Sequence, residues 1–214
     1  MPELLRGAGT AILVVLCAET IGTILGLGLA LCRLSGTRLL RWPALVYVDL
    51  FRGTPMLVQI LFVYFALPDL LGHLTGQKYI IPALAAGIAA LGLNSAAYVS
   101  EVYRAAISAI DKGQIEASRA LGLSRIQTMR HIVLPQAFRL AIPPLGNEFI
   151  TLLKDTSLLS VISVSEILYQ GQIYGSRTYA VLPSYLGVAI VYLALTLPTT
   201  AALRGLEKKL KVPA

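Results

Sequence analysis

Six polar or charged residues lie within or beside long apolar segments, where a group able to bind a solute is costly to place. They are Glu19, Gln59, Asn94, Ser95, Glu148 and Lys154. Charged groups within a bilayer mark solute pathways or partner contacts, because lipid alone does not solvate them. We hypothesise that these residues contribute to a polar cavity that conducts a solute, and contact with Glu19 would favour a cationic one. Bracing of helix ends or subunits stays open for Glu148 and Lys154, as does a partner contact for Glu19.

Catalytic chemistry has little support in this sequence. His73 and His131 are isolated, and neither a metal site, a nucleophile–base pair nor a phosphate-binding loop ending in Lys-Ser or Lys-Thr can be assembled. Cys17 and Cys32 would lie about 22 Å apart on one helix, too far to pair. The sequence therefore predicts no enzyme activity and no cofactor bound by this chain.

The composition predicts an all-α integral membrane protein. Of the 214 residues, 56% are hydrophobic and 14% are charged, whereas soluble domains carry about 25% charged residues. A chain this short cannot bury so much apolar surface in one soluble core. We therefore expect residues 1–214 to form a single transmembrane domain.

Five segments approach the roughly 20 apolar residues that a spanning helix needs. They are residues 8–32, 54–71, 80–99, 140–167 and 181–203, with an apolar lead-in to the second at 42–51. The fourth contains several charges, so four or six spans stay open. A cleaved signal sequence in place of the first span is disfavoured because the apolar run is too long.

Local signals refine the ends and contacts of these helices. Thr54 and Pro55 are typical of a helix N-cap followed by proline at the first helical position. Arg52 is three residues from Asp49 and could pair with it. The Gly22-x-x-x-Gly26 spacing favours close packing of the first span against a neighbour.

The basic residues predict an orientation. Most of the 18 lysines and arginines follow the first, third or fifth span, including Lys208, Lys209 and Lys211 after the last. Loops rich in Lys and Arg face the cytoplasm. The N-terminus is therefore expected outside and the C-terminus inside, and the net charge of +7 needs no nucleic acid to explain it.

Residues 101–135 form the one long polar connection. A first short helix is predicted at 114–121, and Gly122 ends it. Ser124 and Gln127 have the spacing of a capping box, which would start a second helix that ends near Pro135. The pair would make a rigid projection, although an amphipathic connector lying on the membrane surface is the alternative.

The same connection carries a recognisable motif. Glu116-Ala117-Ser118, three residues, Gly122, nine residues and Ile132-Val133-Leu134-Pro135 resemble the signature of binding-protein-dependent ABC importer permeases. That signature reads Glu-Ala-Ala, three residues, Gly, nine residues, Ile, one residue, Leu-Pro. Ser118 is the sole departure, and serine is small enough to keep a close helix contact.

Further segments resemble the histidine, glutamine and arginine permeases of this family. They are residues 52–59, 94–101, 146–150 and 154–159, and the stretches 65–68 and 154–157 look closest to the glutamine type. The resemblance implies the type I ABC importer permease fold, in a bacterial inner membrane, with a coupling loop at about 111–135. An ATP-independent secondary transporter is the alternative, although the two halves show no internal repeat.

The resemblance also implies partners. A cytoplasmic ABC ATPase dimer would bind ATP and Mg and receive the coupling loop in a groove. The residues implied in this coupling are Glu116, Ala117, Ser118, Gly122, Ile132, Leu134 and Pro135. A second permease subunit, of the same or a sister chain, would complete the pathway, and an external binding protein would deliver a polar amino acid.

Overall fold

The computed structural model describes residues 2–210, and every regular element in that range is a helix. The elements are α1 (Pro2–Leu34), α2 (Arg38–Gly53), α3 (Met56–Leu61), the π-helix η1 (Phe62–Ala66), α4 (Leu67–Thr75), α5 (Ala83–Ser108), α6 (Lys112–Ala120), α7 (Arg125–Thr128), the π-helix η2 (Met129–Val133), α8 (Leu134–Asp155), the 3₁₀-helix η3 (Thr156–Ile162), α9 (Ile167–Thr178) and α10 (Val181–Leu210). The all-α membrane fold is confirmed.

Within residues 2–210, four helical segments are long and apolar enough to cross a membrane: Pro2–Leu34, Met56–Thr75, Ala83–Ser108 and Val181–Lys209. They confirm the first, second, third and fifth predicted spans. The predicted fourth segment, 140–167, is not one continuous helix. Helix α8 begins earlier, at Leu134, and the chain turns at Ser163, which has a φ of 62°. Because left-handed backbone interrupts a helix, α9 forms as a separate element.

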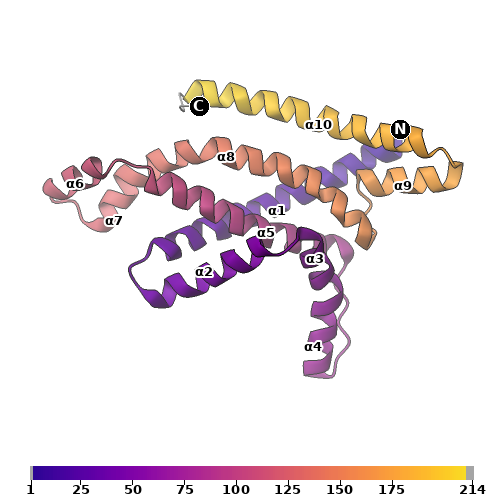
Figure 1. Cartoon of the computed structure of the whole chain (residues 1–214), viewed down its shortest axis with the longest axis horizontal. Coiled ribbons are helices and arrows are strands. Elements are labelled where there is room, and N and C mark those ends of the chain that lie inside the picture. Colours follow the sequence, from indigo (N-terminus) through magenta and orange to yellow (C-terminus); the bar gives the residue numbers. More distant parts are fainter. Residues whose placement is uncertain (1, 211–214) are drawn as a thin grey trace.

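Helices α1 and α5 pack side by side at the centre of the bundle (Figure 1). A Cβ atom added to Gly26 would lie 2.8 Å from a methyl carbon of Val99 on α5. One added to Gly22 would come closer still to the Ser95 side chain. The predicted close packing of this face is confirmed. Helix α8 packs against α5, and α10 packs against α8 and α9.

Glu166 fixes the start of α9. It is fully buried, and its carboxylate accepts hydrogen bonds from the backbone N–H groups of Leu168 (2.8 Å) and Tyr169 (2.6 Å). The Tyr192 hydroxyl of α10 donates a third, at 2.8 Å. Gly7 of α1 packs against the Glu166 backbone, where an added Cβ would approach to 2.8 Å. This cap therefore ties α1, α9 and α10 together.

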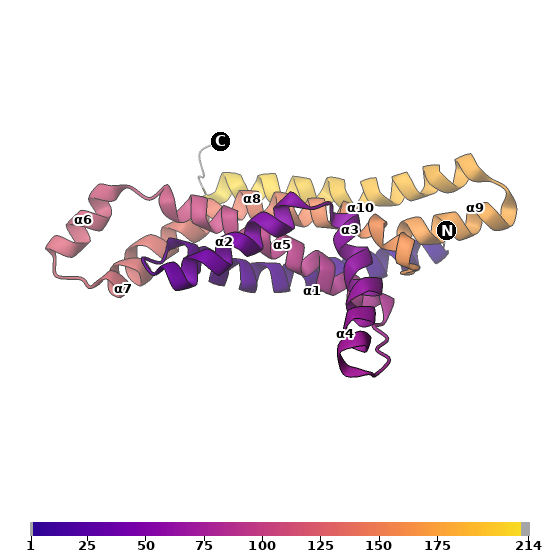
Figure 2. The same ribbon diagram turned by 60° about the horizontal axis from the view of Figure 1, so that its bottom comes forward.

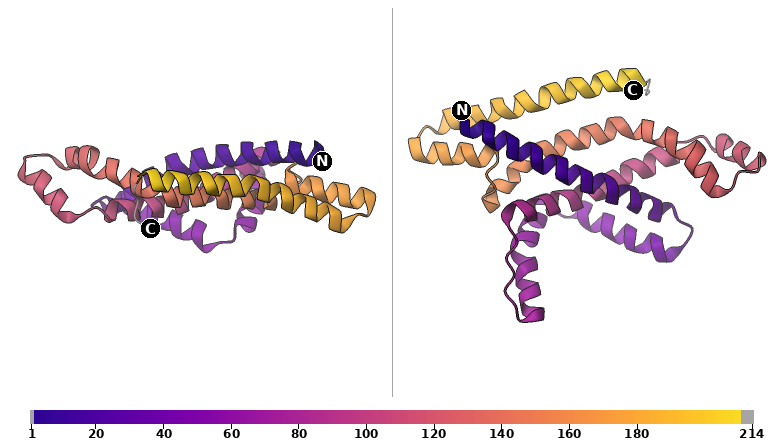
Figure 3. Two further views of the ribbon diagram at one scale, coloured as in Figure 1. Left: turned by 90° about the horizontal axis from the view of Figure 1, so that it is seen from above. Right: turned by 180° about the vertical axis from the view of Figure 1, so that it is seen from behind.

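Two parts extend from the bundle. Helices α3 and α4, with η1 between them, form an arm that diverges from the other helices (Figure 2). Large apolar side chains are exposed along this arm: Val58, Phe62, Phe65, Leu70 and Leu74. Helices α6 and α7 project from one end of the molecule, opposite α9 (Figure 3). The exposed apolar surface of the α3–α4 arm suits contact with lipid or another subunit.

Two local predictions about helix ends are wrong. Thr54 does not cap α3, which starts at Met56; its hydroxyl donates to the Leu50 carbonyl at 2.8 Å and closes α2 instead. The second loop helix does not end near Pro135. It continues through the π-helix η2 into α8, and Pro135 lies in the first turn of α8.

Candidate functional site

The projection is the segment 111–135, built around a tight turn between α6 and α7. Gly122 adopts a φ of 84°, which side-chain-bearing residues rarely tolerate. The predicted capping box is confirmed: the Ser124 hydroxyl accepts from the Gln127 backbone N–H at 3.3 Å. The Gln127 side chain accepts in return from the Ser124 N–H at 2.8 Å. The turn is therefore fixed by the left-handed backbone of Gly122 and, just after it, by the capping box that starts α7.

Ser118, the departure from the family signature, joins the two helices of the projection. Its buried hydroxyl donates to the Ile115 carbonyl at 2.8 Å and lies 2.9 Å from the Thr128 hydroxyl. Because serine has one hydroxyl proton, Thr128 is the donor of the second bond. An alanine here would leave the buried Thr128 hydroxyl without this acceptor, so serine is structurally matched to threonine.

The tip of the projection is apolar and exposed. Leu121 is 82% exposed and Ile126 is 79% exposed, and both flank the Gly122 turn. The other residues of the motif differ in exposure: Glu116, Ala117, Gly122 and Pro135 are exposed, while Ile132 and Leu134 are half-buried. Exposed leucine and isoleucine on a rigid turn form a surface that a partner could cover.

A second polar arrangement lies where α2 ends beside α5. The buried Gln59 amide donates to the Phe51 carbonyl and the Thr54 hydroxyl, both at 2.8 Å. The Asn94 amide of α5 donates to the Gln59 side-chain oxygen at 2.9 Å. These two candidate pathway residues therefore also satisfy backbone groups left open by the end of α2.

The remaining pathway candidates are divided. Ser95, next to Asn94, donates to the Glu19 carboxylate at 3.2 Å, and Glu19 lines an open pocket of about 250 Å³ together with Phe149 of α8. Glu148 is half-buried beside Phe149, whereas Lys154 is exposed. The structure thus brings together Gln59, Asn94, Ser95 and Glu19, with Glu148 near them. Lys154 stands apart.

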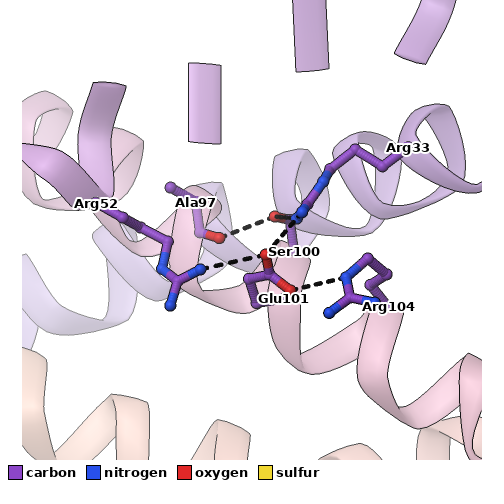
Figure 4. A network of polar contacts seen from close by, with 6 residues as sticks. All are labelled: Arg33, Arg52, Ala97, Ser100, Glu101 and Arg104. Carbon is purple, nitrogen blue, oxygen red and sulfur yellow. Dashed lines mark hydrogen bonds and ion pairs between the residues drawn. The ribbon is translucent and has the colours of Figure 1, made fainter. Parts of the chain in front are cut away.

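Sequence reasoning missed an ionic cluster on three helices (Figure 4). The Glu101 carboxylate contacts Arg33 of α1 at 2.7 Å, Arg52 of α2 at 3.2 Å and Arg104 of α5 at 2.8 Å. The expected pairing of Arg52 with Asp49 is wrong, because α5 presents a carboxylate to it. Only the spacing of Glu101 and Arg104 gave a local signal.

Replacing Asn94 with leucine tests the polar arrangement. The change removes the donor to Gln59 and leaves a buried amide oxygen unpaired, at a cost of about 1–3 kcal/mol. We expect a lower midpoint of thermal unfolding in detergent. Asn147→Leu, at an exposed position on α8, is the control and should unfold like the parent. Equal midpoints for both variants would show that the amide pair does not stabilise the fold.

Apolar helices of spanning length, polar contacts between them and an apolar-tipped projection are the features of a membrane transport subunit. The chain belongs to the family described as binding-protein-dependent transport system inner membrane components, whose pattern matches residues 22–212. It is a permease subunit of an amino-acid ABC transporter.

Individual relatives cover almost the whole chain. The arginine transport system permease protein ArtQ of Bacillus subtilis is 40% identical over 99% of this chain and 94% of its own length. The glutamine transport system permease protein GlnP of Escherichia coli K12 is 38% identical over the same shares. A crystal structure of an amino acid ABC transporter with histidines superposes with a TM-score of 0.90 at 37% identity, covering 97% of this chain and 94% of that one.

The fold is shared more widely than the sequence. A chain of the MetNI methionine ABC transporter in an inward-facing conformation superposes with a TM-score of 0.80 at 21% identity, over 98% of this chain and 97% of that one. The expected type I importer permease fold is confirmed by these similarities.

Proposed function

We propose that this chain forms the membrane pathway for uptake of a polar amino acid and couples that uptake to ATP hydrolysis on a separate ABC ATPase dimer. The observation that carries the proposal is the projection. It combines the family's coupling signature with a rigid turn at Gly122 and exposed Leu121 and Ile126. ATP and Mg would bind to the ATPase, and this chain would bind no cofactor itself.

The residues divide into two groups in this proposal. The coupling group is the seven-residue motif set named above, with Leu121 and Ile126 added at the tip. The pathway group comprises Glu19, Gln59, Asn94, Ser95, Glu148 and Lys154. The first four are supported by their contacts between apolar helices: Gln59 bonds to the end of α2, Asn94 bonds to Gln59, and Ser95 bonds to Glu19. Glu148 and Lys154 are included for their charge in an apolar segment.

The orientation of the chain in the membrane is inferred from the positions of its lysines and arginines. The projection carries Lys112, Arg119, Arg125 and Arg130, so it would face the cytoplasm of a bacterial inner membrane. The N-terminus would then lie outside and the C-terminus inside; Lys211 of the basic C-terminal group is outside the described residues. A second permease subunit would complete the pathway and an external binding protein would deliver the amino acid.

Glutamine is the favoured substrate within this proposal. Residues 65–68 and 154–157 resemble the glutamine-type permeases, and GlnP of Escherichia coli is 38% identical to this chain. Arginine is the competing substrate, because ArtQ of Bacillus subtilis is equally similar.

Reconstitution tests the proposal. The chain would be purified with the proteins that accompany it in its native membrane, placed in vesicles, and assayed for uptake of radiolabelled glutamine and arginine with ATP on either side. We expect uptake that requires ATP on one side and favours glutamine. Faster arginine uptake would overturn the substrate assignment. Uptake that follows an ion gradient without ATP would support a secondary transporter instead.

A further inference from the structure

The ionic cluster carries more positive charge than its single carboxylate can balance. Glu101 accepts from Arg33 through Oε1 and from Arg104 through Oε2, and Arg52 contacts Oε1 as well (Figure 4). Three guanidinium groups therefore share one carboxylate. Since arginine stays protonated in proteins, the cluster has a surplus of two positive charges.

The three arginine side chains differ in their exposure to solvent. Arg33 is only 8% exposed, its Nη1 donates to the Ser100 hydroxyl at 3.5 Å, and its Nε is buried without a partner. The side chains of Arg52 and Arg104 are 43% and 40% exposed. Arg33 is thus the buried counter-ion of Glu101, and the surplus charge is accessible on Arg52 and Arg104.

This surplus charge borders an open concavity of about 680 Å³. Arg52, Glu101 and Arg104 line one side, and Ala105 and Ala109 of α5 form a floor of small side chains. The volume lies within the range of small-molecule sites, about 300–1,000 Å³. Small floor residues leave the guanidinium groups accessible to a ligand in the concavity.

The opposite wall offers hydrogen-bond acceptors. Helix α8 contains Pro143 and Pro144, which lack the N–H groups that the carbonyls of Arg139 and Leu140 would otherwise receive. Leu140 and Pro144 both line the concavity. A helical carbonyl points towards the residue four positions later, so the Leu140 carbonyl lacks its usual helical donor beside Pro144.

We propose that this concavity binds the amino acid through its zwitterionic backbone as it leaves the pathway at the end of the bundle that bears the projection. Arg52 and Arg104 bind the α-carboxylate in place of Glu101, and the Leu140 carbonyl accepts from the α-ammonium group. The inference rests on the proposed function, because it takes an amino acid as the solute. The site recognises only groups that amino acids share, so selectivity lies elsewhere in the pathway.

Equilibrium binding to the purified transporter complex tests this site. Radiolabelled glutamine is the probe, and 4-aminobutanamide, which is glutamine without its carboxylate, is the competitor. We expect Arg52→Gln and Arg104→Gln each to weaken glutamine binding about tenfold, because each removes a charge-assisted hydrogen bond to the carboxylate. Affinity for 4-aminobutanamide should not change. Arg38→Gln, at an exposed position on α2, is the control, and unfolding midpoints verify that every variant is folded.

The outcomes separate this site from the proposed function. Wild-type affinity in both variants, or no binding by a complex that transports glutamine, overturns the site alone. A complex that neither binds nor transports any amino acid overturns the proposed function. If the variants lose co-purified anionic phospholipid while glutamine binding is unchanged, a lipid headgroup occupies the concavity and the site proposal fails.

Discussion

Leu121→Glu is expected to remove the co-purifying ATPase and to reduce ATP-driven uptake by a factor of a hundred or more. Leu121 is 82% exposed at the tip of the projection, so the change should not disturb the fold. At a docked interface, however, an unpaired carboxylate would be buried, and its desolvation costs several kcal/mol. About 2.7 kcal/mol already corresponds to a hundredfold loss of affinity.

Leu39 provides the matched control for this experiment. It is 85% exposed near the start of α2, outside the projection. Leu39→Glu introduces the same charge in the same chain and should retain both the ATPase and uptake. The measurement is the amount of ATPase recovered per mole of permease, together with the initial uptake rate. Equal recovery of the ATPase with wild type, Leu121→Glu and Leu39→Glu would show that the coupling contact does not lie at the tip.

Gly26→Leu is expected to destabilise the bundle by about 3 kcal/mol, at the upper end of the cost of overpacking. An added Cβ at Gly26 would lie 2.8 Å from a Val99 methyl carbon and 3.0 Å from the Ala96 carbonyl oxygen. The carbonyl belongs to the α5 backbone and cannot rotate away, so a leucine here must push α1 and α5 apart. These two helices form the centre of the packing, and their separation would loosen the whole fold.

The same helix contains the control. Gly28 has no atom within 4 Å of an added Cβ, so Gly28→Leu gains the same helix propensity, about 1 kcal/mol, without a clash. The measurement is the midpoint of thermal unfolding in detergent, with the fraction of monodisperse protein as a second readout. Similar midpoints for Gly26→Leu and Gly28→Leu would show that α1 and α5 are not held at the close approach seen here.

Some predictions from short-range pattern are confirmed, whereas the N-cap at Thr54 and the helix end near Pro135 are not. Long apolar runs gave four of the five spans because helix length and side-chain hydropathy are properties of one segment. The capping box at Ser124 and Gln127 was predictable because its donors and acceptors lie three residues apart. The predicted fourth segment is interrupted at Ser163, and Glu166, whose carboxylate caps the start of α9, also accepts a hydrogen bond from Tyr192 of the distant α10.

The candidate site was only partly accessible to sequence reasoning. Residue type alone marked Gln59, Asn94, Ser95 and Glu19 as unusual in apolar surroundings, and the structure brings them together. Their partners could not be predicted. Gln59 bonds to the end of α2, eight residues earlier in the chain, because the helix breaks there and leaves carbonyl groups open.

By itself, the sequence determined the helical membrane class, the coupling signature and the turn at Gly122, since each depends on residues close together in the chain. Only the tertiary structure decided the ionic cluster. Arg33 and Glu101 are separated by 68 positions, and any of several arginines could have reached that carboxylate. The crossing of α1, α2 and α5 selects which charges meet, because a charge taken out of water is stable only where a partner is held within reach.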